Sequence, residues 1–315
     1  MKRVRVGVVG IGHLGNYHLQ KYQKLTNSEI VGVADVIGER AQEAAQAYNC
    51  NVYTDYRELI GAVDAVSIAV PTGFHYLIAK NFLEAGVDVL LEKPIAATLE
   101  EANNLVSIAE ANNLIFQIGF VERFNPAVVA LKKLMRKPLF IEAHRLHPFF
   151  ERGTDVDVIL DLMVHDLDLI LSFVKSPVKD VEAIGVPVLS DKVDIANVRL
   201  VFSSGCVANI TASRISNKVM QKIRFFEKEG YHAVDYRKRE LVSLARKNSA
   251  RDQVAITPNQ VEIKNQDPLE EEIRSFLQAV TERTPPYVSG REGMASLELA
   301  LQIVEKIRTT GELIQ

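Results

Sequence analysis

A lysine suited to catalysis stands in the triplet Glu92-Lys93-Pro94, directly after the apolar run of residues 87–91. Proline restricts the residue before it to extended backbone, so Pro94 limits where the lysine side chain can point. A lysine held in this way can donate to a substrate hydroxyl and stabilise the alkoxide that forms as hydride leaves. The other interpretation, a solvated lysine in a strand-to-helix loop, stays open on composition alone.

A histidine and two acids share one predicted helix, over residues 160–173. Asp161, His165 and Asp168 follow an i, i+4, i+7 spacing, one residue round from the apolar stripe of this helix. An imidazole at such a border can take a hydroxyl proton near neutral pH, and Asp161 can orient it. The alternative is an ordinary helix border, at which acids flank a histidine that already has its hydrogen bonds.

Both groups need elements that position them, and the start of the chain supplies one. An apolar run over residues 4–9 leads into Gly10, Gly12 and Gly15, and a helical segment and a second apolar run follow before Asp35. Gly10 allows a tight turn, Gly12 lets the backbone approach a pyrophosphate, and Gly15 lets helix and strand pack closely. The free N–H groups and dipole at the helix start favour a diphosphate. This order of features predicts a dinucleotide-binding unit.

Asp35 indicates which dinucleotide is bound. It lies twenty positions after Gly15, where a carboxylate accepts hydrogen bonds from a ribose diol. Its charge would repel a 2′-phosphate, so we expect NAD as the cofactor. Arg40 lies nearby and keeps NADP as the second choice.

Strands and helices alternate through residues 1–120, which predicts a doubly wound parallel sheet forming an NAD-binding Rossmann domain. Ligands of such sheets bind beyond the carboxyl ends of the strands. Three motifs fall there: residues 10–15, residues 71–75 and residues 92–94. The expected cofactor-binding residues are Gly10, Ile11, Gly12, His13, Leu14, Gly15, Asp35, Val70, Pro71, Thr72, His75, Glu92 and Lys93.

The pattern changes over residues 121–315, where longer segments rich in β-branched residues appear. They cover residues 139–146, 181–188, 193–202, 206–213 and 219–227. We expect a largely antiparallel open sheet, broken by the helix at 160–173 and followed by two C-terminal helices. The first of these helices has Asp267 as its predicted N-cap and Pro268 at its first position. The predicted fold class is therefore α/β, with an N-terminal Rossmann domain and a C-terminal α/β domain for substrate binding and oligomerisation.

The composition excludes several classes of protein. The 315 residues carry 37 Lys and Arg against 40 Asp and Glu, which indicates neither a nucleic-acid nor a membrane-surface partner. No apolar segment is long enough to span a bilayer, and the start lacks a signal core. Two distant cysteines suit a reducing compartment, so we expect a cytoplasmic protein. The metal-ligand spacings are absent, and we expect no metal.

Taken together, these motifs resemble those of the Gfo/Idh/MocA oxidoreductases, the family of glucose–fructose oxidoreductase and inositol dehydrogenase. The motifs are residues 9–15, Asp35, Pro71-Thr72 with His75, Glu92-Lys93-Pro94, Gly119-Phe120, Arg123-Phe124-Asn125-Pro126, and Asp161 with His165. By this resemblance Lys93 is the catalytic lysine that touches substrate and nicotinamide, and Asp161 and His165 are the proton-handling pair. The family implies NAD-dependent oxidation of a sugar hydroxyl, in a homodimer or homotetramer formed through the C-terminal sheet.

One departure from the family pattern bears on the substrate. Many sugar dehydrogenases of the family carry glycines before and within the helix motif, whereas residues 155–166 are bulkier here. This version is similar to a branch that oxidises C3 of a nucleotide sugar, such as UDP-N-acetylglucosamine, for an aminotransferase in lipid A biosynthesis. Arg123, Asn125 and Arg152 are then candidates for contacts with the polar or diphosphate part of the substrate. Each of them is equally open to being an ordinary surface or ion-paired residue.

Two alternatives to a sugar dehydrogenase remain. A reductase of another carbonyl or unsaturated small molecule could use the same cofactor half, which carries little information about the substrate. A regulatory protein could sense bound dinucleotide without turning it over. The joint presence of Lys93, Asp161 and His165 argues against a sensor, which needs only the nucleotide site.

Overall fold

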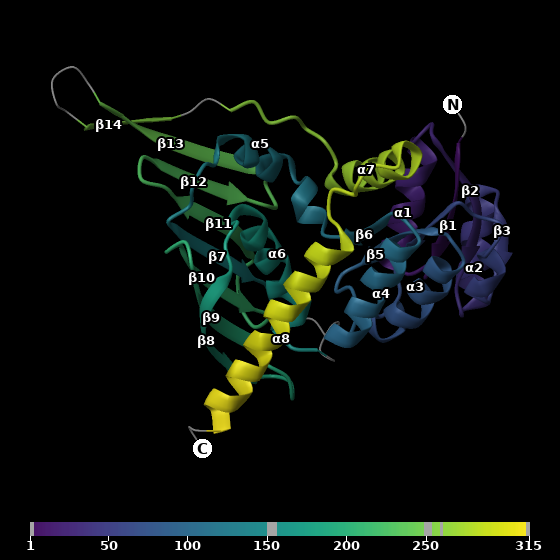
Figure 1. The fold of residues 1–315 in the computed structure, drawn as a ribbon, viewed down its shortest axis with the longest axis horizontal. Helices are drawn as coiled ribbons and strands as arrows, with labels where there is room; N and C mark the ends of the chain where they lie inside the picture. The colour runs from purple at the N-terminus through teal and green to yellow at the C-terminus, as the bar shows by residue number, and fades with distance from the viewer. Residues whose placement is uncertain (1–2, 150–155, 249–253, 259–260, 313–315) are drawn as a thin grey trace. The chain divides into compact units, whose positions relative to one another are not determined.

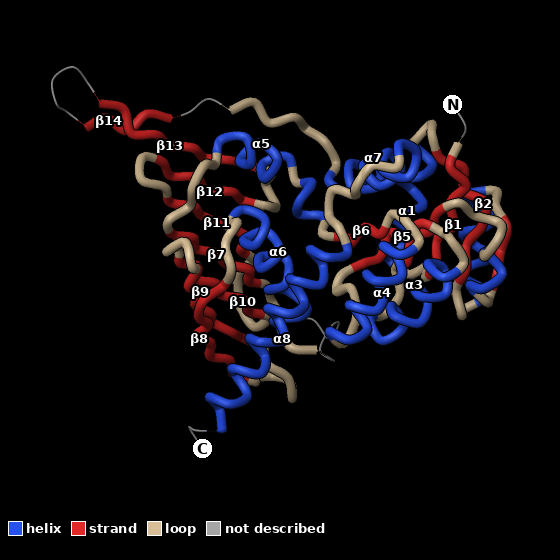
Figure 2. Tube along the Cα trace, viewed as in Figure 1, coloured by secondary structure: helices blue, strands red, loops and turns tan. Residues whose placement is uncertain are grey.

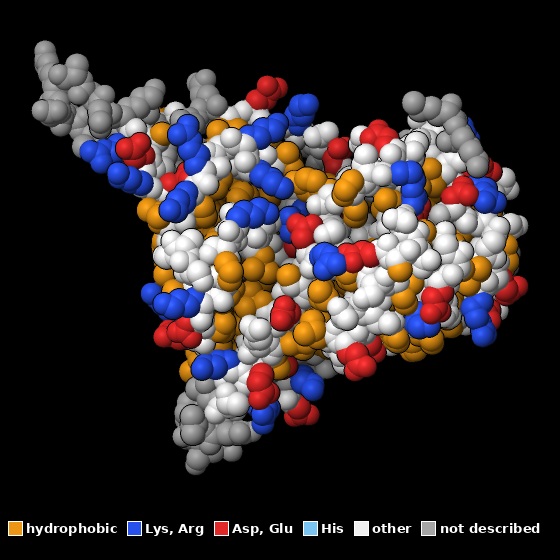
Figure 3. Space-filling view, in the orientation of Figure 1, with side chains coloured by type: hydrophobic (Ala, Val, Ile, Leu, Met, Phe, Trp, Pro, Cys, Tyr) orange, Lys and Arg blue, Asp and Glu red, His pale blue; other side chains and the backbone are white. Residues whose placement is uncertain are grey.

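The computed structural model (Figures 1 and 2) describes residues 3–149, 156–248, 254–258 and 261–312. Within these ranges, no helix is both long enough and apolar enough to cross a membrane. Acidic and basic side chains both occur on the visible surface of each half of the chain (Figure 3). The even mixture agrees with the balanced charge of the sequence.

The chain forms two compact units. Unit 1 runs to Val121 and resumes over Asp267–Leu297, while unit 2 takes Glu122–Gln266 and the chain from Glu298 onward. The sequence led us to expect a single boundary after residue 120, with everything beyond it in the second domain. The placement of Asp267–Leu297 in unit 1 differs from that expectation.

Unit 1 is built on a six-stranded sheet in the order β3-β2-β1-β4-β5-β6, in which every neighbouring pair is parallel. The predicted doubly wound parallel sheet is therefore confirmed. Its strands are β1 (Val4–Val9), β2 (Ser28–Ala34), β3 (Asn51–Tyr53), β4 (Ala65–Ile68), β5 (Asp88–Glu92) and β6 (Phe116–Gly119). Its helices are α1 (His13–Lys24), α2 (Gly38–Tyr48), η1 (Tyr56–Leu59), η2 (Thr72–Phe74), α3 (His75–Glu84), α4 (Leu99–Ala111), α7 (Pro268–Glu282) and the first part of α8 (Gly290–Glu312).

Helix α7 belongs to unit 1 because its apolar side has its partners there. Asp267 caps the helix by accepting a hydrogen bond from the Glu270 N–H at 3.0 Å, and Pro268 follows at the first helical position, as the sequence predicted. Ile273 and Phe276 are fully buried in one apolar cluster with Leu19 of α1 and with residues of β1. The helix therefore completes a core that the first 121 residues begin.

Unit 2 is built on an eight-stranded sheet in the order β14-β13-β12-β11-β7-β10-β9-β8. All its neighbouring pairs are antiparallel except β7 with β10, so the predicted largely antiparallel sheet is confirmed. The strands are β7 (Phe140–Leu146), β8 (Val178–Val186), β9 (Ile195–Phe202), β10 (Val207–Ser213), β11 (Met220–Phe226), β12 (Gly230–Asp235), β13 (Glu240–Asn248) and β14 (Val254–Pro258). The helical segments are η3 (Val121–Phe124), α5 (Pro126–Leu134), η4 (Ile159–Met163), α6 (Val164–Phe173) and the rest of α8.

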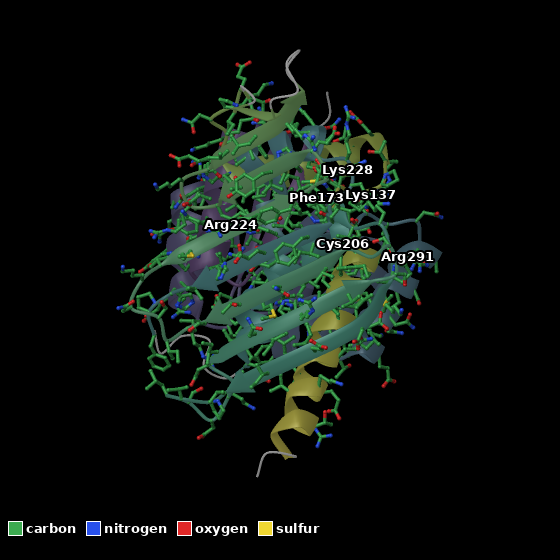
Figure 4. The ribbon with its side chains drawn as sticks, turned by 90° about the vertical axis from the view of Figure 1, so that its left-hand side faces the viewer. Lys137, Phe173, Cys206, Arg224, Lys228 and Arg291 are labelled. Atoms are coloured by element: carbon green, nitrogen blue, oxygen red, sulfur yellow. The ribbon has the colours of Figure 1, made fainter. Side chains whose placement is uncertain are left out.

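One face of this sheet carries the helices and the core. Alternate strand residues such as Ile141, Leu200 and Ile223 pack in one buried cluster with Leu131 of α5 and Ile170 of α6. The opposite face is turned to the viewer in Figure 4, and no helix among the parts drawn crosses it. The two faces differ because successive side chains along each strand point to opposite sides of the sheet.

Three strands of the sheet were absent from the prediction. Residues 230–258 form β12, β13 and β14, which extend the sheet beyond β11. Charged residues are frequent in this stretch: Asp235, Lys238, Arg239 and Glu240 surround the turn between β12 and β13. β12 pairs with β11, β13 with β12 and β14 with β13, and this pairing holds the strands in the sheet despite a weak local signal, because strand formation depends strongly on neighbouring strands.

Candidate active site

The glycine turn of unit 1 has the geometry that a diphosphate requires. Gly10 has φ +88°, and a β-carbon there would lie 2.5 Å from the Ala69 carbonyl oxygen. A β-carbon on Gly15 would lie 1.9 Å from the Gly10 carbonyl oxygen, which confirms the predicted close packing of the helix against the strand and turn at this position. At Gly12 a β-carbon would meet no atom within 4 Å. Because Gly12 is also the N-cap of α1 and provides no side-chain cap, the helix start is open to a ligand.

Asp35 lies beside this turn, as the sequence predicted. It follows the last residue of β2, and its carboxylate accepts hydrogen bonds from the backbone N–H groups of Ile11 at 2.6 Å and Ile37 at 2.8 Å. Asp35 is half-buried, and each carboxylate oxygen can accept more than one hydrogen bond. His13 and Leu14, in the first turn of α1, are exposed. Of the residues assigned to the dinucleotide at this turn, Gly12, His13, Leu14 and Asp35 are at least partly accessible, whereas Gly10, Ile11 and Gly15 are buried.

His75 has a different position from the one expected. Its ring is 1% exposed, and its two nitrogens lie 2.7 Å from the Pro94 carbonyl oxygen and 2.8 Å from the Val70 carbonyl oxygen. Both ring nitrogens are therefore used within the protein, and a contact of His75 with the cofactor stays a prediction. Burial lowers the pKa of His75, although the two carbonyl oxygens oppose that shift. The ring connects the loop after β4 with the turn after β5.

Residues Val70, Pro71 and Thr72 form that loop after β4. Val70 and Thr72 are half-buried, and Pro71 is exposed. The loop ends in the short helix η2, in which the Phe74 N–H donates to the Pro71 carbonyl oxygen at 2.9 Å. A cofactor contact of these three residues stays a prediction.

Lys93 lies directly after the last residue of β5 and is half-buried. The peptide bond between Lys93 and Pro94 is cis, a feature that the sequence analysis did not anticipate. Glu92, which we expected to touch the cofactor, has a partner inside the protein: its Oε1 lies 3.1 Å from Nε2 of His18 on α1. Its contact with a cofactor stays a prediction.

In unit 2, His165 and Asp161 lie on consecutive helical segments. Asp161 is in the π-helical segment η4, and His165 is in the first turn of α6; both are half-buried. The π-helix adds a residue to the turn, and such bulges occur frequently at functional sites. It also breaks the expected stripe, because Asp168 is 1% exposed and does not share the accessible border.

Two buried ion pairs hold the start of α6. Asp166 accepts from the Nε and Nη2 groups of Arg145 at 2.8 and 3.1 Å, and Asp168 accepts from the Nε and Nη2 groups of Arg123 at 2.6 and 2.8 Å. Both pairs have the bidentate geometry that fixes orientation as well as charge. Because Asp166 and Asp168 lie one and three positions after His165, the two pairs limit how this part of the helix can move.

Arg145 is the centre of a larger buried network. Its guanidinium also lies 3.2 Å from Glu122 and 4.9 Å from the centre of the Tyr236 ring, and the Tyr236 hydroxyl donates to Asp166 at 3.2 Å. Burial alone would lower the pKa of Arg145, but the charges of Asp166 and Glu122 raise it above the ordinary value. No local sequence pattern indicated this network, because its members are far apart along the chain.

Two of the three candidates for substrate contacts are structural residues. Arg123 is 4% exposed and paired with Asp168, so the ion-paired alternative left open by the sequence is the one observed. Asn125 is 2% exposed; it caps α5 by accepting from the Ala127 N–H and donates to the Tyr236 carbonyl oxygen. A contact of Arg123 or Asn125 with the substrate stays a prediction. Arg152 lies outside the described residues.

Comparison with known proteins adds to this geometry. Residues 4–120 match the model of the oxidoreductase family with an NAD-binding Rossmann fold, GFO_IDH_MocA, and residues 137–231 match the GFO/IDH/MocA C-terminal domain. The chain is 37% identical to the UDP-N-acetylglucosamine 3-dehydrogenase of Acidithiobacillus ferrooxidans, over 96% of this chain and 97% of that protein. A solved structure of the Acidithiobacillus ferrooxidans enzyme superposes with a TM-score of 0.92 at 36% identity, covering 98% of this chain and 99% of that one.

More distant relatives act on other compounds. The inositol 2-dehydrogenase/D-chiro-inositol 3-dehydrogenase of Shouchella clausii is 34% identical, over 53% of this chain and 52% of that protein. A levoglucosan dehydrogenase solved with NADH has a TM-score of 0.88 at 21% identity, covering 98% of each chain, which shows a shared fold.

Proposed function

The chain belongs to the Gfo/Idh/MocA family of oxidoreductases, and from this premise we propose that it oxidises the C3 hydroxyl of a nucleotide sugar, UDP-N-acetylglucosamine, with NAD as the cofactor. The observation that carries the substrate assignment is the extent of the match to the Acidithiobacillus ferrooxidans enzyme. It spans 96% of this chain at 37% identity and so includes the substrate-binding half. The inositol dehydrogenase match covers only about half of the chain, 53%.

The reaction removes a hydride from C3 and a proton from the C3 hydroxyl. When bound, the nicotinamide ring supplies the acceptor for the hydride. His165 takes the hydroxyl proton, and Asp161 stabilises the imidazolium that results. Lys93 donates to the hydroxyl oxygen, where its positive charge stabilises the negative charge that develops during the reaction.

The dinucleotide would be held by the backbone of the glycine turn and by Asp35. The N–H groups at the start of α1 face the open space at Gly12, where the diphosphate would bind. Asp35 would accept hydrogen bonds from the ribose diol, and its charge would oppose a 2′-phosphate. The keto product would serve an aminotransferase, and lipid A biosynthesis is the pathway that we propose for it.

We also propose a homo-oligomer that forms through the helix-free face of the sheet in unit 2. Phe140, Phe226 and Tyr231 make an aromatic row across β7, β11 and β12, with ring centres 5.5 and 5.2 Å apart. All three are only half-buried in the single chain. Arg224 pairs with Glu142 at 2.8 Å on the same face (Figure 4). Aromatic side chains with nearby arginine are enriched in protein interfaces.

The first test is the absorbance of reduced nicotinamide with NAD and UDP-N-acetylglucosamine, in the presence of a trap for the ketone. Free N-acetylglucosamine, myo-inositol and NADP are measured in parallel. We expect turnover with the nucleotide sugar and NAD. An enzyme that turns over inositol or the free sugar better would contradict the substrate. A flat trace for every compound, in protein that binds NAD, would favour a reductase or a dinucleotide sensor.

The matched variant is Lys93→Met, which keeps the side-chain length and removes the charge. We expect kcat to fall about 100-fold to 1000-fold, the usual cost of removing a donor to a developing oxyanion. The dissociation constant for NAD, measured by fluorescence or calorimetry, should stay close to that of the wild type. Unchanged turnover would remove Lys93 from the mechanism.

A further inference from the structure

Unit 1 contains a buried polar cluster that the proposed reaction does not use. It consists of His18 on α1, Glu92 at the end of β5, Gln117 on β6 and Glu272 on α7, and we call it the Glu272 cluster. His18, Gln117 and Glu272 are 0% exposed. Three of its side chains have buried polar atoms without a hydrogen-bond partner among the residues described: both carboxyl oxygens of Glu272, Nδ1 of His18 and Oε1 of Gln117.

The arrangement gives the two acids unequal roles. Glu92 has His18 as a partner at 3.1 Å, and its side chain is 12% exposed. Glu272 has no cationic partner in the part of the chain that the structure describes. An ionised carboxylate that is buried without a partner costs several kcal/mol, so a neutral acid is the stable form. Burial, and next the charge of Glu92, raises the pKa of Glu272 well above its ordinary value.

Among the residues that the structure describes, no charge other than that of Glu92 shifts the pKa of Glu272. Tyr22 of α1 faces the acid; burial and, to a smaller extent, Glu272 raise the Tyr22 pKa, and its hydroxyl lies 2.7 Å from Ser67 of β4. From β6, Gln117 donates its Nε2–H to the backbone carbonyl oxygen of Glu272 at 3.2 Å. The groups that face the acid are therefore neutral, apart from the Glu92 and His18 pair.

The unsatisfied atoms indicate an internal water. A neutral carboxyl has one O–H to donate and one oxygen to accept with, and the Gln117 Oε1 atom needs a donor. Buried polar atoms of this kind are commonly joined by an ordered water that makes about three hydrogen bonds. One water between Glu272 and Gln117 would satisfy them.

Glu92 connects this cluster to Lys93, the residue that follows it. Glu92 pairs with Gly119 in the ladder between β5 and β6, and a β-carbon on Gly119 would lie 3.1 Å from the Glu92 carboxylate. Because Gly119 has no side chain, the carboxylate has room beside β6. On its other side the carboxylate contacts His18 of α1. The direction in which Glu92 points fixes the end of β5 and the start of the turn.

We propose that Glu272 is a neutral, proton-bearing acid that acts as a positioning residue, joined through an internal water to Gln117 of β6, the strand paired with β5, and thereby fixing the turn that carries Lys93. The effect on turnover rests on the proposed function of Lys93. The protonation of Glu272 does not, and can be measured separately.

Infrared difference spectroscopy of the full-length protein tests the protonation. Spectra of the wild type at neutral pH are compared with those of Glu272→Gln, and with those of Glu271→Gln as the control, because Glu271 is a neighbouring acid on the same helix that is only half-buried and pairs with Arg274. We expect a carboxylic-acid C=O band that is lost in Glu272→Gln and kept in Glu271→Gln. If the wild type and Glu272→Gln show the same carboxylic-acid C=O bands, the proposal is overturned.

Turnover tests the positioning. Glu272→Gln keeps a neutral polar group and should keep kcat, whereas Glu272→Leu removes the water's partner and should lower kcat between about 10-fold and 100-fold, as a small displacement of a reacting group does. The NAD dissociation constant should not change in either variant.

At alkaline pH the wild type should lose kcat while Glu272→Gln does not. Equal kcat in Glu272→Leu and the wild type would overturn the positioning role. If the wild type oxidises no nucleotide sugar, the function fails while the infrared result still stands.

Discussion

Asp35 shows how one side chain can set cofactor preference and loop geometry together. Its carboxylate accepts from the Ile11 N–H in the glycine turn and from the Ile37 N–H after β2, so it fixes the place where a ribose would bind. Because the same oxygens would accept the ribose hydroxyls, a substitution changes both the turn and the recognition. The preference for NAD over NADP is therefore best tested with two variants.

Asp35→Ala should raise KM for NAD about 10-fold to 100-fold, the cost of losing hydrogen bonds to a charged group. KM for NADP should change much less, because the charge that repels its phosphate is also lost. Asp35→Asn serves as the control, since it keeps an acceptor for the Ile11 N–H and removes only the charge. Steady-state kinetics with both cofactors provide the comparison, and an equal loss for NAD and NADP would contradict our assignment.

A second prediction at this scale concerns stability and pH. The pKa of Glu272 is raised in the folded state, so its favourable contribution is complete below its unfolded pKa and is lost as the pH rises toward the folded value. Glu272→Gln has no such titration. As the pH rises through this window, the free energy of unfolding of the wild type should therefore fall relative to that of Glu272→Gln by about 1.4 kcal/mol per pH unit. Urea titrations from pH 5 to 9 measure the slope, and parallel curves would show that Glu272 does not change its protonation on unfolding.

Among the elements, α6 depends most on buried charge. Its acids Asp166 and Asp168 are paired with Arg145 of β7 and Arg123 of η3, and all four side chains are at most 5% exposed. Such pairs contribute little net stability, because both charges must leave water, but breaking one of them is costly. Their role here is to orient the helix turn that carries His165.

Asp168→Asn should therefore lower the free energy of unfolding by about 3–5 kcal/mol, because it leaves the Arg123 charge buried without its partner. Chemical denaturation at neutral pH measures this loss. The double variant Arg123→Met with Asp168→Leu should recover most of it, since neither charge remains. A single variant as stable as the wild type would mean that water or another group reaches the guanidinium.

The elements also show what could be predicted from the sequence. The glycine turn, the start of α7 at Asp267-Pro268 and the turn with Lys93 depend on neighbouring residues, and each was located correctly. Pro94 lies 19 positions from His75, Asp168 lies 45 from Arg123 and His18 lies 74 from Glu92, and local patterns do not reveal such distant partners. The strands β12 to β14 were missed for the same reason, because their neighbours in the sheet determine them.

For the whole molecule, the helix-free sheet face gives a testable assembly. Phe226→Glu places a charge in the aromatic row with Phe140 and Tyr231, and should shift the protein to a smaller species in sedimentation velocity. Gln20→Glu, at an exposed position on α1, adds the same charge elsewhere and should leave the assembly unchanged. A wild-type protein that sediments as a monomer would refute the proposed oligomer directly.

The membership of α7 in unit 1 has a consequence for synthesis in the cell. The first strand of the nucleotide-binding sheet is complete at Val9, whereas α7, whose Phe276 covers the same core, begins only at Pro268. At a translation rate of about 5–20 residues per second, roughly 13–50 seconds separate the two. During that time the nascent chain exposes the apolar surface around Leu19 that α7 later covers. The nucleotide-binding half, although encoded first, can thus complete its core only after α7 has been synthesised.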